Sequence, residues 1–228
     1  MMLNPSGGLV GGDRLRTSVE VGPGAAVVLT TASATKVYRT EGEAASHRTL
    51  ITLRDGAALE YLPDHVIPHT GSVLRQSLSV EMAPGSRAIV YDAIAAGRIG
   101  RGERWDFREM ASEIAIRRDD RPVYISRSRI IPRVQPLTQP GWMEAFNYLA
   151  TVVVVADSIT AWSRVLDEID VTLRQHPAVY SGVSEISAGG WVVRLMTRTA
   201  ADLIIAKGKI WAIARRAVLG LDAFDLRK

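Results

Sequence analysis

Hydrophobic and polar residues alternate in short runs over the first two-thirds of the chain, and the runs are separated by glycine and proline. Alternation with a period of two, bounded by turn residues, predicts β-strands. Three units follow one plan: a strand, a glycine turn and a second strand. Their predicted strands are residues 14–21 and 25–30, 48–53 and 57–62, and 73–82 and 86–91. Two further runs extend this strand region, at residues 105–117 and 122–131.

The turns of these units recur at a regular distance. Gly24, Gly56 and Gly85 lie 32 and 29 residues apart, within the range of stacked repeat architectures. Glycine suits such turns because it adopts positive φ without a steric penalty. A single hairpin cannot bury its apolar face alone, so the repeat favours stacked or layered β-strands of a β-solenoid-like kind. An antiparallel meander is the alternative that the sequence leaves open.

The last third contains two segments of helical periodicity. The first, residues 158–175, follows an apolar run at 149–156, with Asp157 as a plausible N-cap. The second has a capping-box-like start at Thr199 and ends at Gly220. Gly208 lies inside this helix at a cost of about 1 kcal/mol relative to alanine, so we expect close packing against it. The apolar stripes of the two helices are Ile159, Trp162, Leu166, Ile169 and Leu173, and Leu203, Ile210, Trp211, Ala214 and Val218.

These elements predict a mainly β fold with two α-helices of the C-terminal half packed on the strands. Residues 132–141 are rich in proline and mark the predicted boundary between two regions. We expect a β-rich repeat region at residues 1–131 and a β plus two-helix region at residues 132–228. The two regions are expected to be integrated as one domain.

The amino-acid composition mainly excludes certain kinds of site and certain classes of protein. The 228 residues include no cysteine, which excludes disulfides, thiolate metal sites and cysteine nucleophiles, and fits a reducing compartment. With 47% hydrophobic and 23% charged residues, the chain has the balance of a folded globular protein. No stretch approaches the roughly 18–20 apolar residues of a membrane span, and the opening residues lack the pattern of an export signal. We therefore expect a soluble protein.

The net charge of +4 is accounted for within residues 98–133, which contain ten arginines and six acidic residues. A basic segment raises the possibility of nucleic-acid binding. The acids alternate with the arginines, however, as on a solvated strand face or a polar protein interface. We therefore favour the latter two interpretations over a nucleic-acid module.

Two glycine pairs precede Asp13, and their spacing is similar to that of a phosphate-binding loop. Asp13 stands where such a loop needs lysine, and no serine or threonine follows to hold magnesium. The glycines are better explained by a tight crossover in which backbones approach each other, with Asp13 bonding loop amides.

His65 and His69 are the candidate metal ligands, with Asp64 as a third oxygen donor. Imidazole and carboxylate groups suit nickel or zinc. Pro63 precedes the pair and Pro68 lies between the two histidines, so a shared helix face is excluded and only a loop could join them. Two solvated surface histidines are the alternative.

No signature of nucleophilic hydrolysis is present, because the chain lacks a G-x-S-x-G elbow. Two carboxylate pairs leave a second hypothesis open, that of a β-repeat enzyme acting on carbohydrate. The pairs are Glu60 with Asp64 and Glu103 with Asp106. Nothing in the sequence sets the separation that such chemistry needs.

Four ordered blocks resemble the UreD (also called UreH) family of urease accessory proteins. They are GGLVGGD at residues 7–13, TTASATKVYR at 30–39, LEYLP at 59–63 and GRIGRGE at 97–103. The resemblance implies structural or partner-contacting roles for the block residues Gly7, Gly8, Gly11, Gly12, Asp13, Thr31, Lys36, Tyr38, Arg39, Glu60, Pro63, Arg98, Gly102 and Glu103.

The resemblance also implies a function. Members of this family are scaffolds or chaperones of nickel insertion that act on apo-urease with the accessory protein UreF and the GTPase UreG. By this resemblance we expect a cytoplasmic protein with no catalytic centre, no tightly bound cofactor and nickel only in transit. A dimer of heterocomplexes is expected, with neither nucleic acid nor membrane as a partner.

Family members usually carry additional strand-forming chain before the first block. The resemblance therefore implies that the start of this chain is truncated or misassigned, or that the first strands are lacking. A lacking strand would expose a sheet edge, which promotes aggregation.

Overall fold

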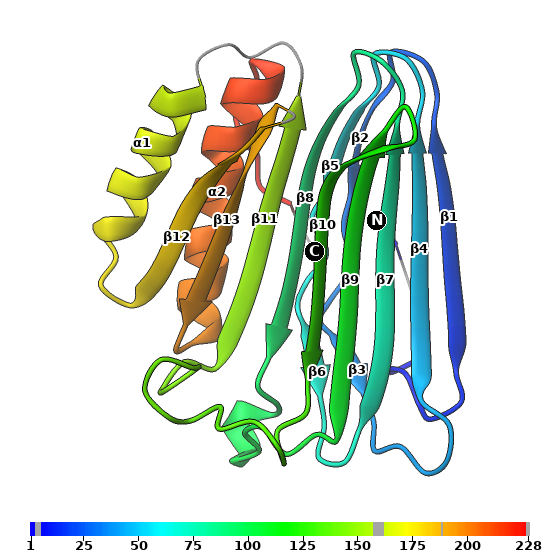
Figure 1. Ribbon diagram of the computed structural model, residues 1–228, viewed down its shortest axis with the longest axis vertical. Helices are drawn as coiled ribbons and strands as arrows, with labels where there is room; N and C mark the ends of the chain where they lie inside the picture. The colour runs from blue at the N-terminus through cyan, green and yellow to red at the C-terminus, as the bar shows by residue number, and fades with distance from the viewer. Residues whose placement is uncertain (3–5, 157–161, 188, 227–228) are drawn as a thin grey trace.

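The computed structural model describes residues 1–2, 6–156, 162–187 and 189–226. Two β-sheets pack face to face in this part of the chain, and two helices cover the outer side of one of them (Figure 1). The five-stranded sheet has the order β1-β4-β7-β9-β10. Its strands are β1 Arg14–Val21, β4 Ala45–Leu53, β7 Val73–Met82, β9 Glu109–Arg118 and β10 Arg121–Ile130.

The second sheet has eight described strands, and its main path runs β12-β13-β11-β8-β5-β2. The short strands β3 and β6 pair with each other, and β6 also joins β8. The strands are β2 Ala26–Leu29, β3 Thr35–Val37, β5 Ala58–Tyr61, β6 Val66–Pro68, β8 Arg87–Ala95, β11 Tyr148–Ala156, β12 Val179–Ile186 and β13 Gly190–Thr197.

Successive repeat units pair in parallel, as in a β-solenoid. Strands β1, β4, β7 and β9 form one parallel ladder, and β2, β5 and β8 form a second. The turns stack as well, since the N–H of Gly24 donates to the carbonyl of Asp55 at 2.9 Å and that of Gly56 donates to Pro84 at 3.1 Å. The solenoid-like prediction is confirmed, and a simple antiparallel meander does not describe this region.

Two strand predictions need correction. Strand β9 begins at Glu109 and not at residue 105, because Trp105 has a φ of 60° and its N–H donates to the carbonyl of Ala96 at 2.7 Å. Strands β12 and β13 between the helices were not predicted. In β12 the mixed serine, glycine and glutamate content hides the alternation that a half-buried strand usually displays, and β13 is an apolar run interrupted by Arg194.

The helices occupy Trp162–Arg174 (α1) and Ala200–Leu219 (α2). The predicted cap Asp157 and the first stripe residue Ile159 lie outside the described residues. At α2 the hydroxyl of Thr199 accepts the N–H of Asp202 at 3.1 Å, and Gly220 ends the helix with a φ of 67°, as the capping pattern predicts. The expectation of close packing at Gly208 is wrong, since a Cβ built there has no described neighbour within 4 Å.

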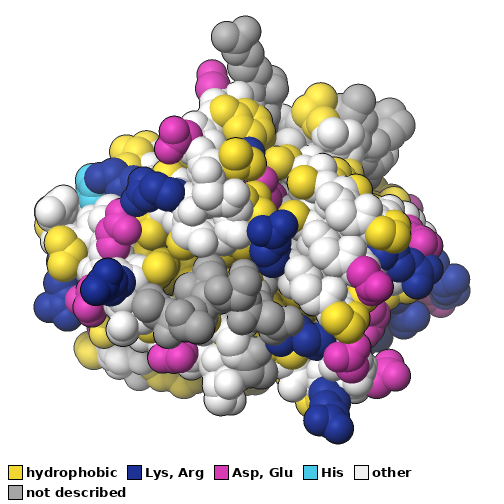
Figure 2. Space-filling model, turned by 90° about the horizontal axis from the view of Figure 1, so that it is seen from above, with side chains coloured by type: hydrophobic (Ala, Val, Ile, Leu, Met, Phe, Trp, Pro, Cys, Tyr) yellow, Lys and Arg dark blue, Asp and Glu magenta, His cyan; other side chains and the backbone are white. Residues whose placement is uncertain are grey.

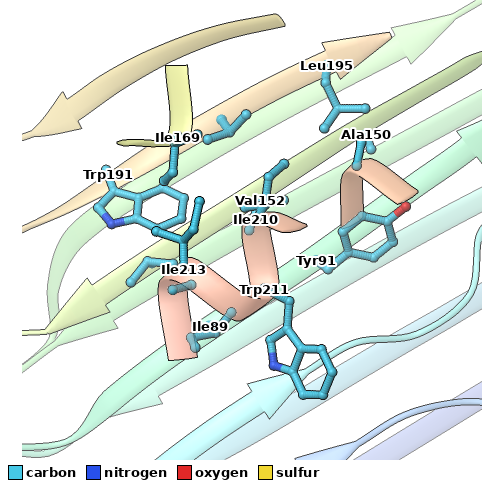
Figure 3. Packing of buried hydrophobic residues seen from close by; sticks show 14 of the residues in the cluster. Ile89, Tyr91, Ala150, Val152, Ile169, Trp191, Leu195, Ile210, Trp211 and Ile213 are labelled. Atoms are coloured by element: carbon cyan, nitrogen blue, oxygen red, sulfur yellow. The ribbon is translucent and has the colours of Figure 1, made fainter. Parts of the chain in front are cut away.

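The helices bury their apolar stripes against the eight-stranded sheet. Ile210 and Ile213 of α2 lie over Val152 and Ile89, with Trp191 at the α1 side (Figure 3). Trp191 is completely buried. Each large apolar side chain buried here contributes about 1.5–3 kcal/mol relative to exposure, so this layer is the main hydrophobic contact of the helices. Neither described helix is long and apolar enough to cross a membrane.

Residues 132–141 form turns between β10 and β11, and Leu137 is buried against the inter-sheet core. Strand β11 pairs with β8 on one side and β13 on the other. The eight-stranded sheet thus contains strands from both sides of the predicted boundary. The division into two regions stays a prediction.

Candidate functional site

The first glycine block crosses the second block at close range. The N–H of Leu9 donates to the carbonyl of Lys36 at 2.8 Å, and the hydroxyl of Tyr38 donates to the carbonyl of Gly7 at 3.0 Å. A Cβ at Gly8 would lie 2.6 Å from the carbonyl oxygen of Lys36. Only glycine allows this approach, so these block residues hold two segments together.

The second glycine pair closes the same crossover. A Cβ at Gly11 would lie 3.1 Å from the carbonyl oxygen of Glu43, and the N–H of Gly12 donates to that oxygen at 2.9 Å. The carboxylate of Asp13 accepts the N–H of Val10 at 2.9 Å. Asp13 therefore bonds a loop amide, and its negative charge makes this turn unsuitable for phosphate.

The fourth block lies beside the second. The Arg98 guanidinium binds both carboxylate oxygens of Glu103, and the N–H of Thr70 donates to one of them at 3.3 Å. These hydrogen bonds, chiefly that of Arg98, lower the pKa of Glu103 to about 2. Gly102 ends the short helix Ile99–Arg101 with a φ of 76°. The ring of His69 stands edge-on to Tyr38, with centroids 5.0 Å apart, which joins this corner to the glycine crossover.

Two residues of the second block have exposed side chains. Lys36 in β3 and Arg39 after it are exposed, and Arg39 lies along Gly71. Thr31, in contrast, accepts the N–H of Asp64 at 2.8 Å through its hydroxyl. This bond connects the second block to the third.

Glu60 of the third block is 3% exposed and faces α2. Its carboxylate accepts the indole N–H of Trp211 at 2.6 Å and pairs with the guanidinium of Arg215. The neighbouring Pro63 carbonyl accepts Lys207 Nζ at 2.8 Å. The third block is thus a buried polar anchor for the last helix.

These contacts correct the carboxylate-pair hypothesis. Glu60 is committed to Trp211 and Arg215, and Glu103 is committed to Arg98. Asp106 accepts the N–H of Arg104 at 3.3 Å within its own turn. A general acid must exchange a proton with the substrate. Carboxylates that are buried, or that already accept two hydrogen bonds from the protein, are poorly placed for that role.

The two candidate metal ligands are held apart. Strand β6 separates His65 from His69, and four residues of extended chain span about 13 Å. The ring of His65 packs edge-on against Tyr148, and that of His69 against Tyr38. Burial and the nearby Arg98 lower the pKa of His69. No group of three or more metal-ligating His, Cys, Asp or Glu side chains occurs in the described ranges.

Some arginines of residues 98–133 pair with acidic side chains of neighbouring strands. Arg127 pairs with Glu113 at 2.8 Å and Arg129 with Glu109 at 2.9 Å, between β10 and β9. Seen from above, basic and acidic side chains are interspersed over the end of the molecule (Figure 2). Such mixing supports a solvated or protein-contacting surface and gives nucleic acid no continuous basic stripe.

A polar layer inside the sandwich was missed by sequence reasoning. His47, Gln76 and Ser112 occupy one row across β4, β7 and β9, and they point toward Asp92 of β8. The side-chain amide of Gln76 donates to Asp92 at 3.2 Å and to Ser112 at 3.0 Å. Apolar clusters lie on both sides of this layer, one around Ile51 and Val80 and the other around Leu74, Val37 and Phe107.

The electrostatics of this layer are unusual. Burial raises the pKa of Asp92 to about 6, against the opposing effect of hydrogen bonds from Gln76 and Ser112. Burial also lowers the pKa of His47 and raises that of Tyr61 to about 12. No ion pair to Asp92 occurs in the described part of the chain. Its side chain faces a cavity of about 30 Å³, which is large enough for a water molecule.

The layer offers imidazole, carboxylate, phenol and hydroxyl groups around a cavity of the size of a water molecule. Such groups can contact a divalent cation without enclosing it. The sequence signal was present but weak: each polar residue takes an inward position on a largely apolar face of its strand. Strand periodicity identifies the face, but only the packed sheets show that these residues meet.

Comparisons with known proteins agree with the arrangement of the blocks. The family described as UreD urease accessory protein matches residues 1–228. A urease accessory protein UreD of Mycolicibacterium gilvum is 37% identical over 217 residues, which cover 95% of this chain and 78% of the relative.

Two further relatives carry similar descriptions. The urease accessory protein UreD of Herpetosiphon aurantiacus is 29% identical, covering 95% of this chain and 78% of its own. The protein UreD 2 of Streptomyces griseus is 33% identical, covering 97% of this chain and 76% of its own. The chain belongs to the UreD family of urease accessory proteins.

Proposed function

We propose that this chain is a non-catalytic scaffold, or chaperone, of urease maturation in the cytoplasm. It acts with UreF and the GTPase UreG to insert nickel into apo-urease, as part of a dimer of heterocomplexes. Family membership supports the role in urease maturation. Nickel is the cargo in this proposal and not a resident cofactor.

The observation that carries the proposal is the polar layer between the two sheets. A protein interior usually excludes an unpaired carboxylate, because an isolated buried charge is costly. Here Asp92, His47 and Gln76 interrupt an otherwise apolar sandwich and border a water-sized cavity. A transiting cation needs such groups, since they replace part of its water shell while holding it weakly.

The layer also suggests why the ion is not retained. Among the described residues it holds one carboxylate and one imidazole in contact with neutral donors, fewer ligands than a closed site has. Weak and sequential contacts allow an ion to leave as readily as it enters. The buried anchor of Glu60 and Arg215 takes no part in this passage, because its charges neutralise each other.

The proposal is tested in a urease-producing host deleted for this gene and complemented with a tagged chain. We expect urease activity and urease-bound nickel to depend on the chain, and UreF and UreG to co-purify with it. A deleted strain that keeps fully nickel-loaded urease would overturn the proposal.

A substitution in the polar layer distinguishes an effect on nickel passage from an effect on assembly with the partner proteins. Ser112→Leu fills the space beside Gln76 and Asp92, so we expect lower urease nickel while the partners still co-purify. Ser18→Leu adds the same side chain on the exposed face of β1 and serves as the control. Equal urease nickel in both variants would exclude the polar layer as the route.

A further inference from the structure

A groove of about 710 Å³ lies on the outer face of the five-stranded sheet, and Gln76 and Ser112 of the polar layer are among the residues that line it. Its floor consists of small outward side chains, Ser46 of β4, Ser77 of β7 and Ala111 of β9. Arginines from four strands line it, and these are Arg14, Arg48, Arg75 and Arg127. The strands that carry them, β1, β4, β7 and β10, belong to one sheet, in which β9 separates β7 from β10 (Figure 1).

The charges in this groove are unbalanced. Arg14 pairs with Glu43 at 3.0 Å and Arg127 with Glu113 at 2.8 Å. Arg48 and Arg75 are exposed and have no ion-pair partner within 4 Å among the described residues. They occupy diagonal positions on neighbouring strands, since Arg75 pairs in register with Ser46 and Arg48 with Ser77. Two like charges on adjacent strands repel each other, and a carboxylate between them relieves that repulsion.

We infer that this groove binds an extended acidic segment of a partner protein, with Arg48 and Arg75 as its main carboxylate contacts. Strands spaced about 4.8 Å apart place β1 about 19 Å from β10, the length of roughly six extended residues. Guanidinium groups hold carboxylates through paired hydrogen bonds. The small floor residues leave room for a peptide backbone and offer hydroxyl partners.

Acidic peptide fits better than nucleic acid. Glu43 and Glu113 pair with Arg14 and Arg127, so the lining leaves two separate guanidinium groups for carboxylates and no continuous basic track for a phosphate backbone. None of its described lining residues is aromatic, so there is no platform for base stacking. The inference goes beyond the proposed function, because it depends on the charge and shape of this face and not on nickel passage.

The test measures fluorescence anisotropy of the full chain with a labelled octapeptide of alternating glutamate and serine. We expect saturable binding that weakens as salt rises. The double variant Arg48→Gln/Arg75→Gln should bind at least about tenfold more weakly, because both unpaired guanidinium groups are lost. The matched control is Arg121→Gln/Arg133→Gln, which removes the same charge from exposed positions outside the groove lining.

A second variant tests shape at constant charge. Ser77→Tyr fills the floor, and we expect it to weaken binding as strongly as the loss of the two arginines. Equal weakening in both double variants, or no binding at low salt, would overturn the inference. Tighter binding of a labelled single-stranded oligonucleotide than of the peptide, dependent on Arg48 and Arg75, would also overturn it and assign the groove to nucleic acid.

Discussion

The eight-stranded sheet carries a carboxylate on each of its two covered faces, and the surroundings of the two differ: Glu60 is buried, whereas Asp92 is half-buried. Glu60 of β5 faces the helices, where Arg215 neutralises it and Trp211 donates to it. Asp92 of β8 faces the other sheet, where Gln76 and Ser112 are its polar neighbours. The first region is a closed structural contact, and the second is a polar interruption of the core beside a small cavity.

The difference shows two ways in which a protein offsets the cost of removing a carboxylate from water. A buried ion pair satisfies both partners, so removing either one leaves an uncompensated charge. An acid that is desolvated without a cation takes up its proton more readily, and this is why the pKa of Asp92 is raised. The Glu60 region is therefore suited to holding α2 on the sheet. The Asp92 region keeps a polar group available for chemistry or transport.

The largest expected change in the free energy of unfolding comes from a substitution in the Glu60 region. Arg215→Ala leaves Glu60 buried without its cation, and we expect the free energy of unfolding to fall by about 3–5 kcal/mol. Urea denaturation at pH 7 measures it. The control Arg216→Ala, on the exposed pair with Glu168, should cost about 1 kcal/mol or less. Similar losses in both variants would mean that Glu60 is hydrated and that the two regions do not differ.

The next largest effect is the pH dependence of stability that Asp92 causes. Its folded pKa of about 6 lies above the ordinary 3.8, so the folded state disfavours the ionised form. Stability from this group is therefore present below pH 3.8 and is lost as pH rises to about 6, by about 3 kcal/mol. The Asp92→Asn variant should not show this fall in the free energy of unfolding, so it should be more stable than the wild type at pH 7 by a similar amount. The measurement is the difference between denaturation curves of wild type and variant from pH 3.5 to 7.

A matched control exists for that experiment. Asp55→Asn changes an exposed turn aspartate and should keep the wild-type pH dependence. If Asp92→Asn follows the wild-type curve across this range, Asp92 is ionised and solvated like an ordinary surface acid. The contrast with Glu60 would then disappear.

A smaller effect isolates the indole hydrogen bond to Glu60. Trp211→Phe removes a donor to a buried carboxylate, a bond worth about 1.5–3 kcal/mol. Trp191→Phe makes the same change at a fully buried tryptophan whose Nε1 has no described partner. We expect Trp211→Phe to be the more destabilising by that amount in urea denaturation. Equal losses would show that packing alone accounts for Trp211.

The smallest effect is on the hydrogen bond from Gln76. Gln76→Leu removes a donor that favours the ionised form of Asp92, so the pKa of Asp92 should rise further and stability at pH 7 should fall by about 1 kcal/mol. Carbon-13 NMR titration of the carboxyl groups measures the pKa. Gln139→Leu, at an exposed position, should leave it unchanged. An unchanged pKa in Gln76→Leu would contradict the hydrogen-bonded layer.

Local patterns predicted much of the fold. Strands β1 and β7 have the predicted bounds, and the start and end of α2 follow from Thr199 and Gly220. The blocks containing Gly8, Asp13 and Glu60 were identified as important, although Trp211 and Arg215, the partners of Glu60, lie about 150 residues further along. The polar layer was not identified, because His47 and Gln76 look like ordinary exceptions in amphipathic strands.

The sequence by itself determined the strand alternation, the glycine period of the stack and the caps of α2, since each depends on residues a few positions apart. Only the tertiary structure decided that Asp92 meets Gln76 and that Glu60 meets Arg215. Alternation assigns a residue to a face of a sheet, but the residue opposite depends on which layer packs there. Which layer packs on a given sheet face depends on the burial of whole faces. This packing gives Glu60 an arginine partner and leaves Asp92, in the same sheet, without one among the described residues.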